Sequence, residues 1–238
     1  MRLAMWSGPR NLSTAMMYAF GNRADFHAVD EPFYGPYLRL TGLNHPMAIE
    51  IRESRPEGPF EVEQSLIGPI PNGKPHAYHK HMCQHMIDGI PRDFMADCVN
   101  VFLLRHPARV VASFTKGYPQ AGADDIGFEK QAELFEHCRA LGQTPVVIDS
   151  ADIRKNPERA LRQLCETVGL DWDPAVLTWS AGPKPYDGAW APHWYKSVHG
   201  STGFAGAEGP LPNLDGRAGA LADEAMQYYD FMVAHAKN

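Results

Sequence analysis

The amino-acid sequence predicts a three-layer α/β fold, in which a mainly parallel sheet lies between two layers of helices. Two observations predict it. Short apolar runs bounded by turn residues recur along the chain, and segments with helical spacing separate them. Right-handed crossovers between parallel strands would place these helices on both faces of the sheet. The expected strands lie near residues 3–6, 26–30, 77–81, 100–104 and 145–149.

The composition predicts one globular domain spanning residues 1–238. Apolar residues make up 44% of the chain, and the formal net charge is −6. Nucleic acids and anionic membranes attract basic surfaces, so this acidic chain argues against both as partners. No apolar run approaches the length of a membrane span, and a strand that begins almost at Met1 leaves no room for a signal peptide. We therefore expect a cytoplasmic protein whose four cysteines are reduced.

A phosphate-binding turn is predicted between the first strand and the first helix. Gly8 and Pro9 break the apolar run, and helical spacing begins at Ser13. A helix start leaves backbone N–H groups without partners and carries the positive end of the helix dipole, so an anion is stabilised there. Arg10 adds a full positive charge. The lysine of the common nucleoside-triphosphate loop is missing, because Thr14 stands in its place.

Glu31 follows the second predicted strand at its carboxyl end. Ligands of open parallel sheets lie beyond the carboxyl ends of the strands, so this carboxylate is expected on the same edge as the first turn. Glu31 is therefore a candidate general base. The alternative is a structural role, in which the carboxylate stabilises the start of a helix at Pro32.

Residues 53–76 are rich in proline and glycine, which predicts a loop or lid insertion with residues 60–62 as a candidate short strand. In the strand that follows, His79 and His81 would share one face and Lys80 would point the other way. With His85, these histidines raise the alternative of a zinc site. No carboxylate or cysteine completes a recognised ligand pattern, and we expect no metal.

The apolar run at residues 100–104 predicts a buried strand that ends at Arg105. Pro107 suits the first turn of the next helix. The guanidinium of Arg105 offers two parallel donors to a phosphate, and the hydroxyl of Ser113 would add a neutral donor. The alternative is that Arg105 is a structural ion-pair partner.

The rest of the chain predicts support for this edge of the sheet. Helical spacing is found at residues 128–141 and 157–168, on either side of the last strand. Residues 181–219 are dense in glycine and proline with interspersed aromatic residues, which predicts a second loop or lid insertion. A final helix carries an apolar stripe from Leu221 to Ala236, which would dock on the sheet or on a second copy of the chain in a homodimer.

The first turn and the Arg105 segment together resemble the sulfotransferase family. The turn resembles its 5′-phosphosulfate loop, commonly P-[KR]-S-G-T-[ST], with Asn11 and Leu12 in place of serine and glycine. Arg105, Pro107 and Ser113 match the spacing R-x-P-x-x-x-x-x-S, with which the family binds a 3′-phosphate. The basic R-K-G motif of the family's C-terminal loop is absent. The resemblance implies a donor site made by Arg10, Asn11, Leu12, Ser13, Thr14, Arg105 and Ser113.

The resemblance also implies a P-loop nucleoside triphosphate hydrolase-like fold and a reaction. A sulfuryl group would move from 3′-phosphoadenosine 5′-phosphosulfate (PAPS) to a hydroxyl or amine of a small-molecule acceptor, which the sequence does not identify. Arg10 would stabilise charge on the departing phosphate, and either Glu31 or His81 would remove the acceptor proton. Two alternatives stay open: a nucleotide-dependent phosphotransferase and a non-catalytic nucleotide-binding module.

Overall fold

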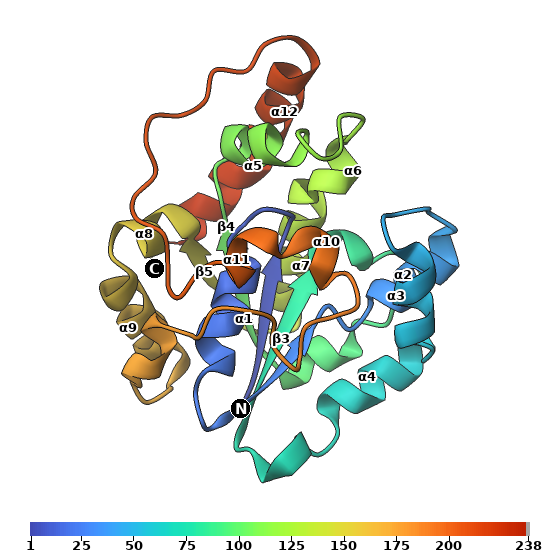
Figure 1. Ribbon diagram of the computed structural model, residues 1–238, viewed down its shortest axis with the longest axis vertical. Coiled ribbons are helices and arrows are strands. Elements are labelled where there is room, and N and C mark those ends of the chain that lie inside the picture. Colours follow the sequence, from blue (N-terminus) through green and yellow to red (C-terminus); the bar gives the residue numbers. More distant parts are fainter. Residues whose placement is uncertain (237–238) are drawn as a thin grey trace.

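The computed structural model describes residues 1–236 and contains a parallel sheet of five strands in the order β2-β3-β1-β4-β5 (Figure 1). All four neighbouring pairs are parallel. The predicted α/β fold and its parallel sheet are confirmed, and each predicted strand is found within two residues of its expected bounds. The strands are β1 (Arg2–Ser7), β2 (Phe26–Asp30), β3 (His76–Met82), β4 (Val99–Leu104) and β5 (Val146–Asp149).

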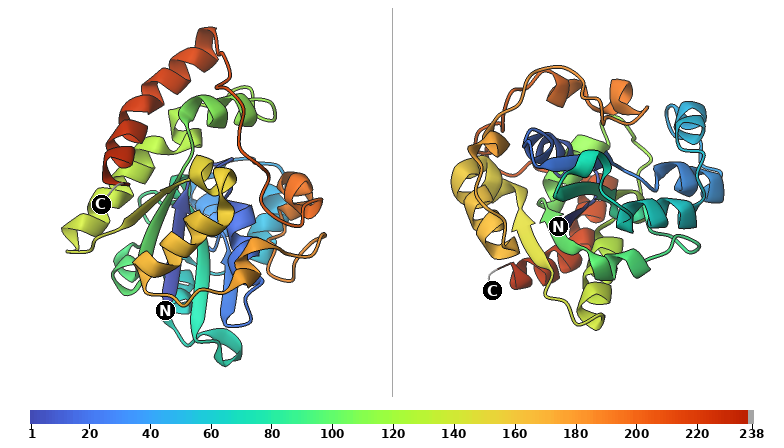
Figure 2. Two further views of the ribbon diagram at one scale, coloured as in Figure 1. Left: turned by 90° about the vertical axis from the view of Figure 1, so that its left-hand side faces the viewer. Right: turned by 90° about the horizontal axis from the view of Figure 1, so that it is seen from below.

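Helices cover both faces of the sheet, as the views from the side and from below show (Figure 2). They are α1 (Ser13–Gly21), α2 (Tyr34–Thr41), α3 (Ala48–Ser54), α4 (Pro59–Ile67), α5 (Pro107–Phe114), α6 (Ala123–Ile126), α7 (Phe128–Ala140), α8 (Ser150–Lys155), α9 (Pro157–Val168), α10 (Ala191–Trp194), α11 (Lys196–His199) and α12 (Gly216–His235).

The central strand β1 and its neighbour β4 contribute to a separate core on each face of the sheet. Leu3 of β1 and Leu103 of β4 pack with α1 and α9, whereas Trp6 and Phe102 pack with α7 on the other face. Side chains alternate along a strand, so a run that is apolar at every position fills both cores. The four cysteines are buried and carry free thiols, as expected.

The region 53–76 contains a helix where residues 60–62 were the candidate strand, so that prediction was wrong. Pro59 occupies the first turn of α4, where its fixed φ is favourable and its missing N–H is not needed. The carboxylate of Glu61 accepts a hydrogen bond from the backbone N–H of Gly58 at 2.7 Å. These local signals at the N-terminus favour a helix over a strand.

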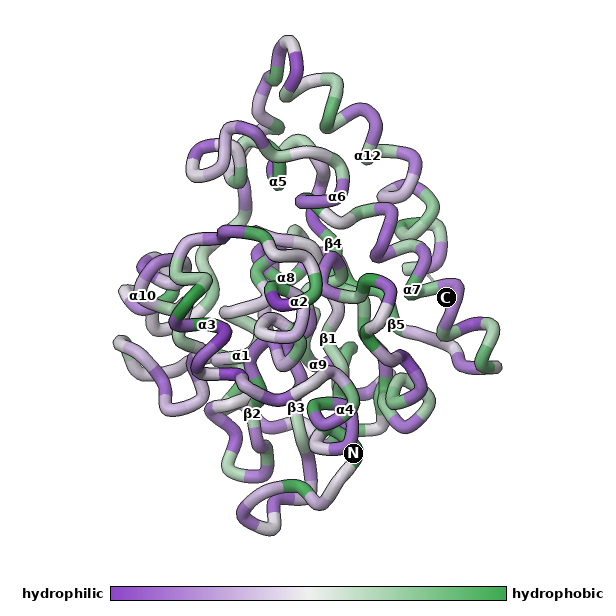
Figure 3. Tube along the Cα trace, turned by 90° about the vertical axis from the view of Figure 1, so that its right-hand side faces the viewer, coloured by the Kyte–Doolittle hydropathy of each residue, from purple (hydrophilic) through white to green (hydrophobic). Residues whose placement is uncertain are grey.

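The apolar stripe of α12 is covered within the chain. Leu221 and Ala225 pack with Val110 and Val111 of α5, and Met232 joins the core around α7. Figure 3 shows α12 lying along α6 and α7. In residues 1–236, no helix is both long enough and apolar enough to cross a membrane.

Candidate functional site

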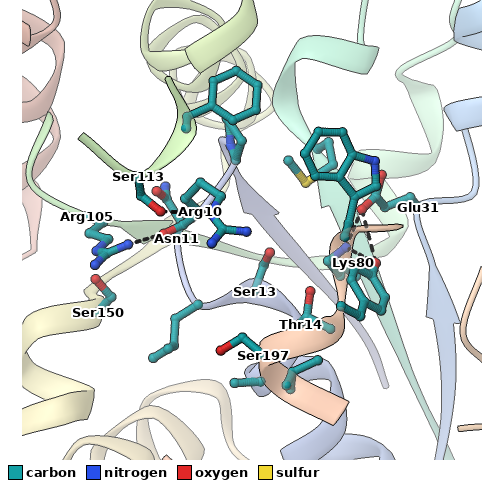
Figure 4. A pocket seen from close by; sticks show the side chains of 18 of the residues that line it. Arg10, Asn11, Ser13, Thr14, Glu31, Lys80, Arg105, Ser113, Ser150 and Ser197 are labelled. Atoms are coloured by element: carbon teal, nitrogen blue, oxygen red, sulfur yellow. Dashed lines mark hydrogen bonds and ion pairs between the residues drawn. The ribbon is translucent and has the colours of Figure 1, made fainter. Parts of the chain in front are cut away.

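A cavity of about 440 Å³ lies at the carboxyl ends of the strands. The β1–α1 turn, the ends of β2 to β4, the start of α8 and the segment 194–205 all contribute to its wall. Every site residue predicted from the sequence lines this cavity except His81. Figure 4 shows Arg105, Ser113 and Ser150 on one side of it and Glu31 with Lys80 on the other.

The β1–α1 turn contains two residues other than glycine in the left-handed conformation. Arg10 and Leu12 have positive φ angles of 61° and 71°, which glycine adopts without strain. Leu12 stands where the sulfotransferase loop usually has glycine, and it takes the left-handed conformation nevertheless. No side chain caps the N-terminus of α1, so the backbone N–H groups of its first turn remain available to a ligand.

Position 8 must be glycine because the backbone of Ile126 approaches it closely. A Cβ atom at this position would lie 2.3 Å from the carbonyl oxygen of Ile126, which is far inside a van der Waals contact. The backbone of α6 therefore fixes how the turn leaves β1.

The turn and the Arg105 segment are in direct contact. Arg10 Nε donates a hydrogen bond to Ser113 Oγ at 2.9 Å, and Arg105 Nη1 donates to the carbonyl oxygen of Arg10 at 2.7 Å. Asn11 is buried, and its Nδ2 donates to the carbonyl oxygen of Leu103 at 3.1 Å. Burial and the charge of Arg105 lower the pKa of Arg10. The two sequence motifs thus form one wall of the cavity.

A cluster of three arginines surrounds one carboxylate beside this wall. Glu208 accepts a hydrogen bond from Arg105 and one from Arg154, the latter at 2.7 Å, and Arg109 Nε lies 3.2 Å from its other oxygen. Burial opposes ionisation of Glu208, but the hydrogen bond from Arg105 and the arginine charges outweigh it and lower its pKa. Three positive charges against one negative charge leave an excess that favours an anion.

Sequence reasoning missed Ser150, Arg154 and Glu208. Ser150 and Arg154 line the cavity, and the hydroxyl of Ser150 is buried with no hydrogen-bond partner among residues 1–236. Ser150 directly follows β5, so the argument applied to Glu31, that ligands lie beyond strand ends, could have found it. Glu208 lies in the glycine- and proline-rich segment, where no pattern indicates a partner.

Lys80 and Glu31 belong to a buried polar network on the opposite side of the cavity. Lys80 Nζ donates to Asp30 Oδ1 at 3.1 Å, to Tyr195 Oη at 2.7 Å and to Glu31 Oε1. Tyr195 Oη also lies 2.8 Å from Asp30 Oδ1 and receives a hydrogen bond from Trp190 Nε1 at 2.9 Å. Sequence reasoning missed Asp30 and Tyr195, since nothing local connects residues 165 positions apart.

Glu31 is held at the end of β2 with its carboxylate facing the cavity. Its φ of 37° is unusual for a residue other than glycine, and its backbone N–H donates to the carbonyl oxygen of Lys80 at 3.0 Å. Burial raises the pKa of Glu31, although the charge of Lys80 opposes this effect. Among residues 1–236, no hydrogen bond is made to its second carboxylate oxygen, Oε2. This oxygen can accept a proton.

His81 lies away from the cavity. It is buried on the other face of β3, where its ring stacks on Trp6 at a centroid distance of 4.3 Å. Burial lowers its pKa far below the usual value. Within the described residues, no three histidine, cysteine or acidic side chains come together as a metal site, and His79 packs edge to face against His81.

The two predicted lid regions differ in their relation to the cavity. None of the residues in 53–76 lines it, whereas the segment 181–219 contributes the short helices α10 and α11 and the residues after them. Trp194, Ser197 and Phe204 are among its contributions. This segment therefore covers the site that the strand ends form.

Comparison with known proteins agrees with this geometry. The family model described as "Sulfotransferase domain" matches residues 1–236. Two solved structures share the fold. The "Sulfotransferase Domain from the Synechococcus PCC 7002 Olefin Synthase" has a TM-score of 0.56 at 17% identity, covering 98% of this chain and 94% of that chain. The "Sulfotransferase Domain from the Curacin Biosynthetic Pathway" has a TM-score of 0.51 at 17% identity, covering 94% and 96%.

Two curated relatives from Arabidopsis thaliana are similar in sequence. "Branched-chain-amino-acid aminotransferase-like protein 1" is 33% identical and "Branched-chain-amino-acid aminotransferase-like protein 2" is 31% identical, each over 98% of this chain. This chain spans only 42% and 41% of their lengths. Each name therefore refers to a whole protein, of which the matched segment is less than half. The match of the family model over residues 1–236, on a fold that two sulfotransferase domains share, shows that the chain belongs to the sulfotransferase family.

Proposed function

We propose that this protein transfers a sulfuryl group from PAPS to a hydroxyl or amine of a small-molecule acceptor. One observation carries the proposal. Hydrogen bonds join Arg10, Ser113 and Arg105, so the two segments predicted to bind phosphate line one wall of a single cavity. A nucleotide with phosphate groups at both its 5′ and 3′ positions needs two such sites at a fixed separation.

The residues present fit the proposed donor. The first turn of α1 offers unpartnered backbone N–H groups, and Arg10 stands beside them, as a 5′-phosphosulfate requires. Arg105 Nε and Ser150 Oγ are buried without partners among residues 1–236, which is costly unless a ligand pairs with them. We propose that Arg105, Ser113, Ser150 and Arg154 hold the 3′-phosphate.

The donor supplies a sulfuryl group on a good phosphate leaving group. In the proposed reaction, the acceptor oxygen forms a bond to sulfur while the bond from sulfur to the phosphate oxygen breaks. Glu31 Oε2 takes the acceptor proton, and Arg10 with the N–H groups of Ser13 and Thr14 stabilises the charge left on the phosphate. Glu31 is favoured over His81 as the base, because only Glu31 faces the cavity.

The phosphotransferase alternative receives less support. The first turn lacks the lysine that such enzymes place on the phosphates, and each of the three donors of Lys80 is used within the protein. A non-catalytic nucleotide-binding module would keep the same donor site, and activity alone separates it from the enzyme.

The first experiment is a calorimetric titration with 3′-phosphoadenosine 5′-phosphate (PAP), ATP and ADP. We expect PAP to bind at least ten-fold more tightly than ATP or ADP, and no magnesium dependence. Absence of PAP binding would contradict the proposal. The second experiment measures transfer of radiolabelled sulfate from PAPS to a library of alcohols and amines, with Glu31→Gln as the matched variant. Tight PAP binding with no transfer to any acceptor would favour the non-catalytic module.

A further inference from the structure

The side of the cavity around Glu31 has features that select an acceptor. Tyr34, His45, Gln84, His85 and Trp194 line it together with Glu31. Tyr34 stacks on His85 at a centroid distance of 4.5 Å, and its hydroxyl lies 3.0 Å from His45 Nδ1. We call these six residues the acceptor pocket. The arginines that line the cavity belong to the donor side, where they contact Ser113 and Glu208.

The acceptor pocket holds no cation free to bind an anion among the described residues. Lys80, which lines the cavity beside Glu31, is the one charged donor next to the pocket, and its three N–H groups go to Asp30, Glu31 and Tyr195. When Glu31 is ionised, as its proposed role as base requires, two carboxylates face one ammonium and the network carries an excess negative charge. Burial lowers the pKa of both His45 and His85, which leaves them neutral near pH 7. A carboxylate or phosphate on the acceptor would find no partner here.

The polar atoms of the pocket that lack partners are hydrogen-bond acceptors, so they favour a ligand that offers donors. Glu31 Oε2 receives no hydrogen bond, and the buried Gln84 Oε1 has no partner among residues 1–236. The O–H of an alcohol is a donor of the kind that Glu31 Oε2 could accept. A ligand that offers only acceptor atoms would leave both oxygens unpaired, which is unfavourable in a buried site.

Two further features favour a positive charge on the acceptor. Aromatic residues Tyr34, Trp194 and Phe114 line the cavity, and an aromatic ring attracts a cation that reaches its face. Asp124 and Asp125 of α6 also act nearby. Their charges add to burial in raising the pKa of Tyr37 to about 12, and the ring of Tyr37 stacks on His85 of the pocket at a centroid distance of 4.8 Å. The phosphosulfate of the donor would add more negative charge when it is bound.

From this arrangement we infer that the acceptor is an alcohol that carries an ammonium group, with its hydroxyl at Glu31 Oε2 and its charge against the aromatic wall. The inference rests on the proposed function, since it names the acceptor of that reaction. It excludes alcohols with a carboxylate or phosphate and ranks neutral alcohols below cationic ones of the same shape.

The test compares three small alcohols: choline, its uncharged isostere 3,3-dimethylbutan-1-ol, and the anion 4-hydroxybutanoate. Each is titrated calorimetrically into protein saturated with PAP, and each is then tested for sulfate transfer from PAPS. We expect choline to bind at least ten-fold more tightly than the isostere, with the same order in kcat/KM, and no binding of the anion. Equal or reversed affinities of choline and the isostere, or no binding of choline, would overturn the inference.

Two variants separate charge from shape. Asp124 is exposed, and we expect Asp124→Asn to lower the advantage of choline two- to three-fold at low salt while leaving the isostere unchanged. Asp171→Asn removes one exposed carboxylate at the opposite end of the sheet, where the backbone carbonyl of Asp171 accepts a hydrogen bond from Arg23, and should change neither. Equal effects of both variants would contradict a local role of Asp124.

Failure of the inference can be told from failure of the proposed function. A protein that does not bind PAP contradicts the proposed function. The three alcohols are then titrated into the free protein, where the same order is expected, because Lys80, Gln84 and the aromatic rings belong to the chain itself. PAP binding followed by preference for the neutral alcohol or the anion overturns only the acceptor class.

Discussion

Glu208 accepts a hydrogen bond from Arg154 at 2.7 Å, although the two residues lie 54 positions apart. The same carboxylate oxygen accepts a hydrogen bond from Arg105. Glu208 is thus bound to two of the four residues proposed to hold the 3′-phosphate, and a phosphate would compete with it for them.

Replacing Glu208 by glutamine should therefore strengthen PAP binding. The amide keeps the shape of the side chain but loses the negative charge that opposes a phosphate, and we expect a five- to ten-fold lower Kd by calorimetry, which corresponds to about 1 kcal/mol. Glu133→Gln, which removes a carboxylate from an ion pair with Arg92, is the matched control and should leave the Kd unchanged. Weaker binding in Glu208→Gln would instead mean that its charge is needed to orient the arginines.

Substituting Arg105 by lysine should weaken donor binding despite the conserved charge. A guanidinium can bridge the carbonyl of Arg10 and a phosphate at once, whereas an ammonium has neither the planar fork nor the reach. We expect Kd for PAP to rise about ten- to hundred-fold, with the free energy of unfolding nearly unchanged. The pair of Arg92 and Glu133, which lies outside the cavity lining, provides the comparison, because Arg92→Lys should have no effect on Kd. An unaltered Kd in Arg105→Lys would remove Arg105 from the donor site.

The rate should depend on pH through Glu31. The base must be ionised, so the rate of transfer is low when Glu31 is protonated and rises with pH through its pKa. Since burial raises this pKa above the usual value for glutamate, the rise should lie at higher pH than for an exposed carboxylate. Glu31→Gln should lower kcat by about 10²- to 10⁴-fold and abolish this limb of the profile. A profile with the same limb in Glu31→Gln would assign it to another group.

Gly8→Ala should disturb the donor site without touching a ligand. Its Cβ would meet the carbonyl of Ile126, so either α6 or the β1–α1 turn must shift. We expect a loss of stability of about 1–3 kcal/mol in denaturant unfolding and a raised KM for PAPS. Gly142→Ala is a suitable comparison, because its Cβ would meet nothing within 4 Å and only its positive φ is strained. A fully stable and active Gly8→Ala protein would contradict this prediction, because it would show that the turn or α6 can shift at no cost.

Much of the fold could be predicted from local pattern. Buried parallel strands are continuous apolar runs, and turn residues bound them, so the five strands were found with small errors at their ends. Pro59 and Glu61 carried a helix signal that the surrounding prolines and glycines obscured. The proposed donor residues, which the structure brings together in one cavity, could be predicted because they lie at strand ends in recognisable spacings. Partnerships such as Tyr195 with Asp30 depend on where a distant loop packs, which no local pattern encodes.

Lys80 should be essential for folding as well as for the acceptor pocket. It is 1% exposed and lies between the carboxylates of Asp30 and Glu31, so Lys80→Met leaves two buried negative charges without their partner. Breaking such a buried pair from one side typically costs about 3–5 kcal/mol, and we expect a loss of this size in urea unfolding at pH 7. The triple variant Lys80→Met, Asp30→Asn, Glu31→Gln removes all three charges and should recover much of that stability while remaining inactive. If the triple variant is as unstable as Lys80→Met alone, the loss comes from packing or from the hydrogen bond to Tyr195 rather than from unpaired charge.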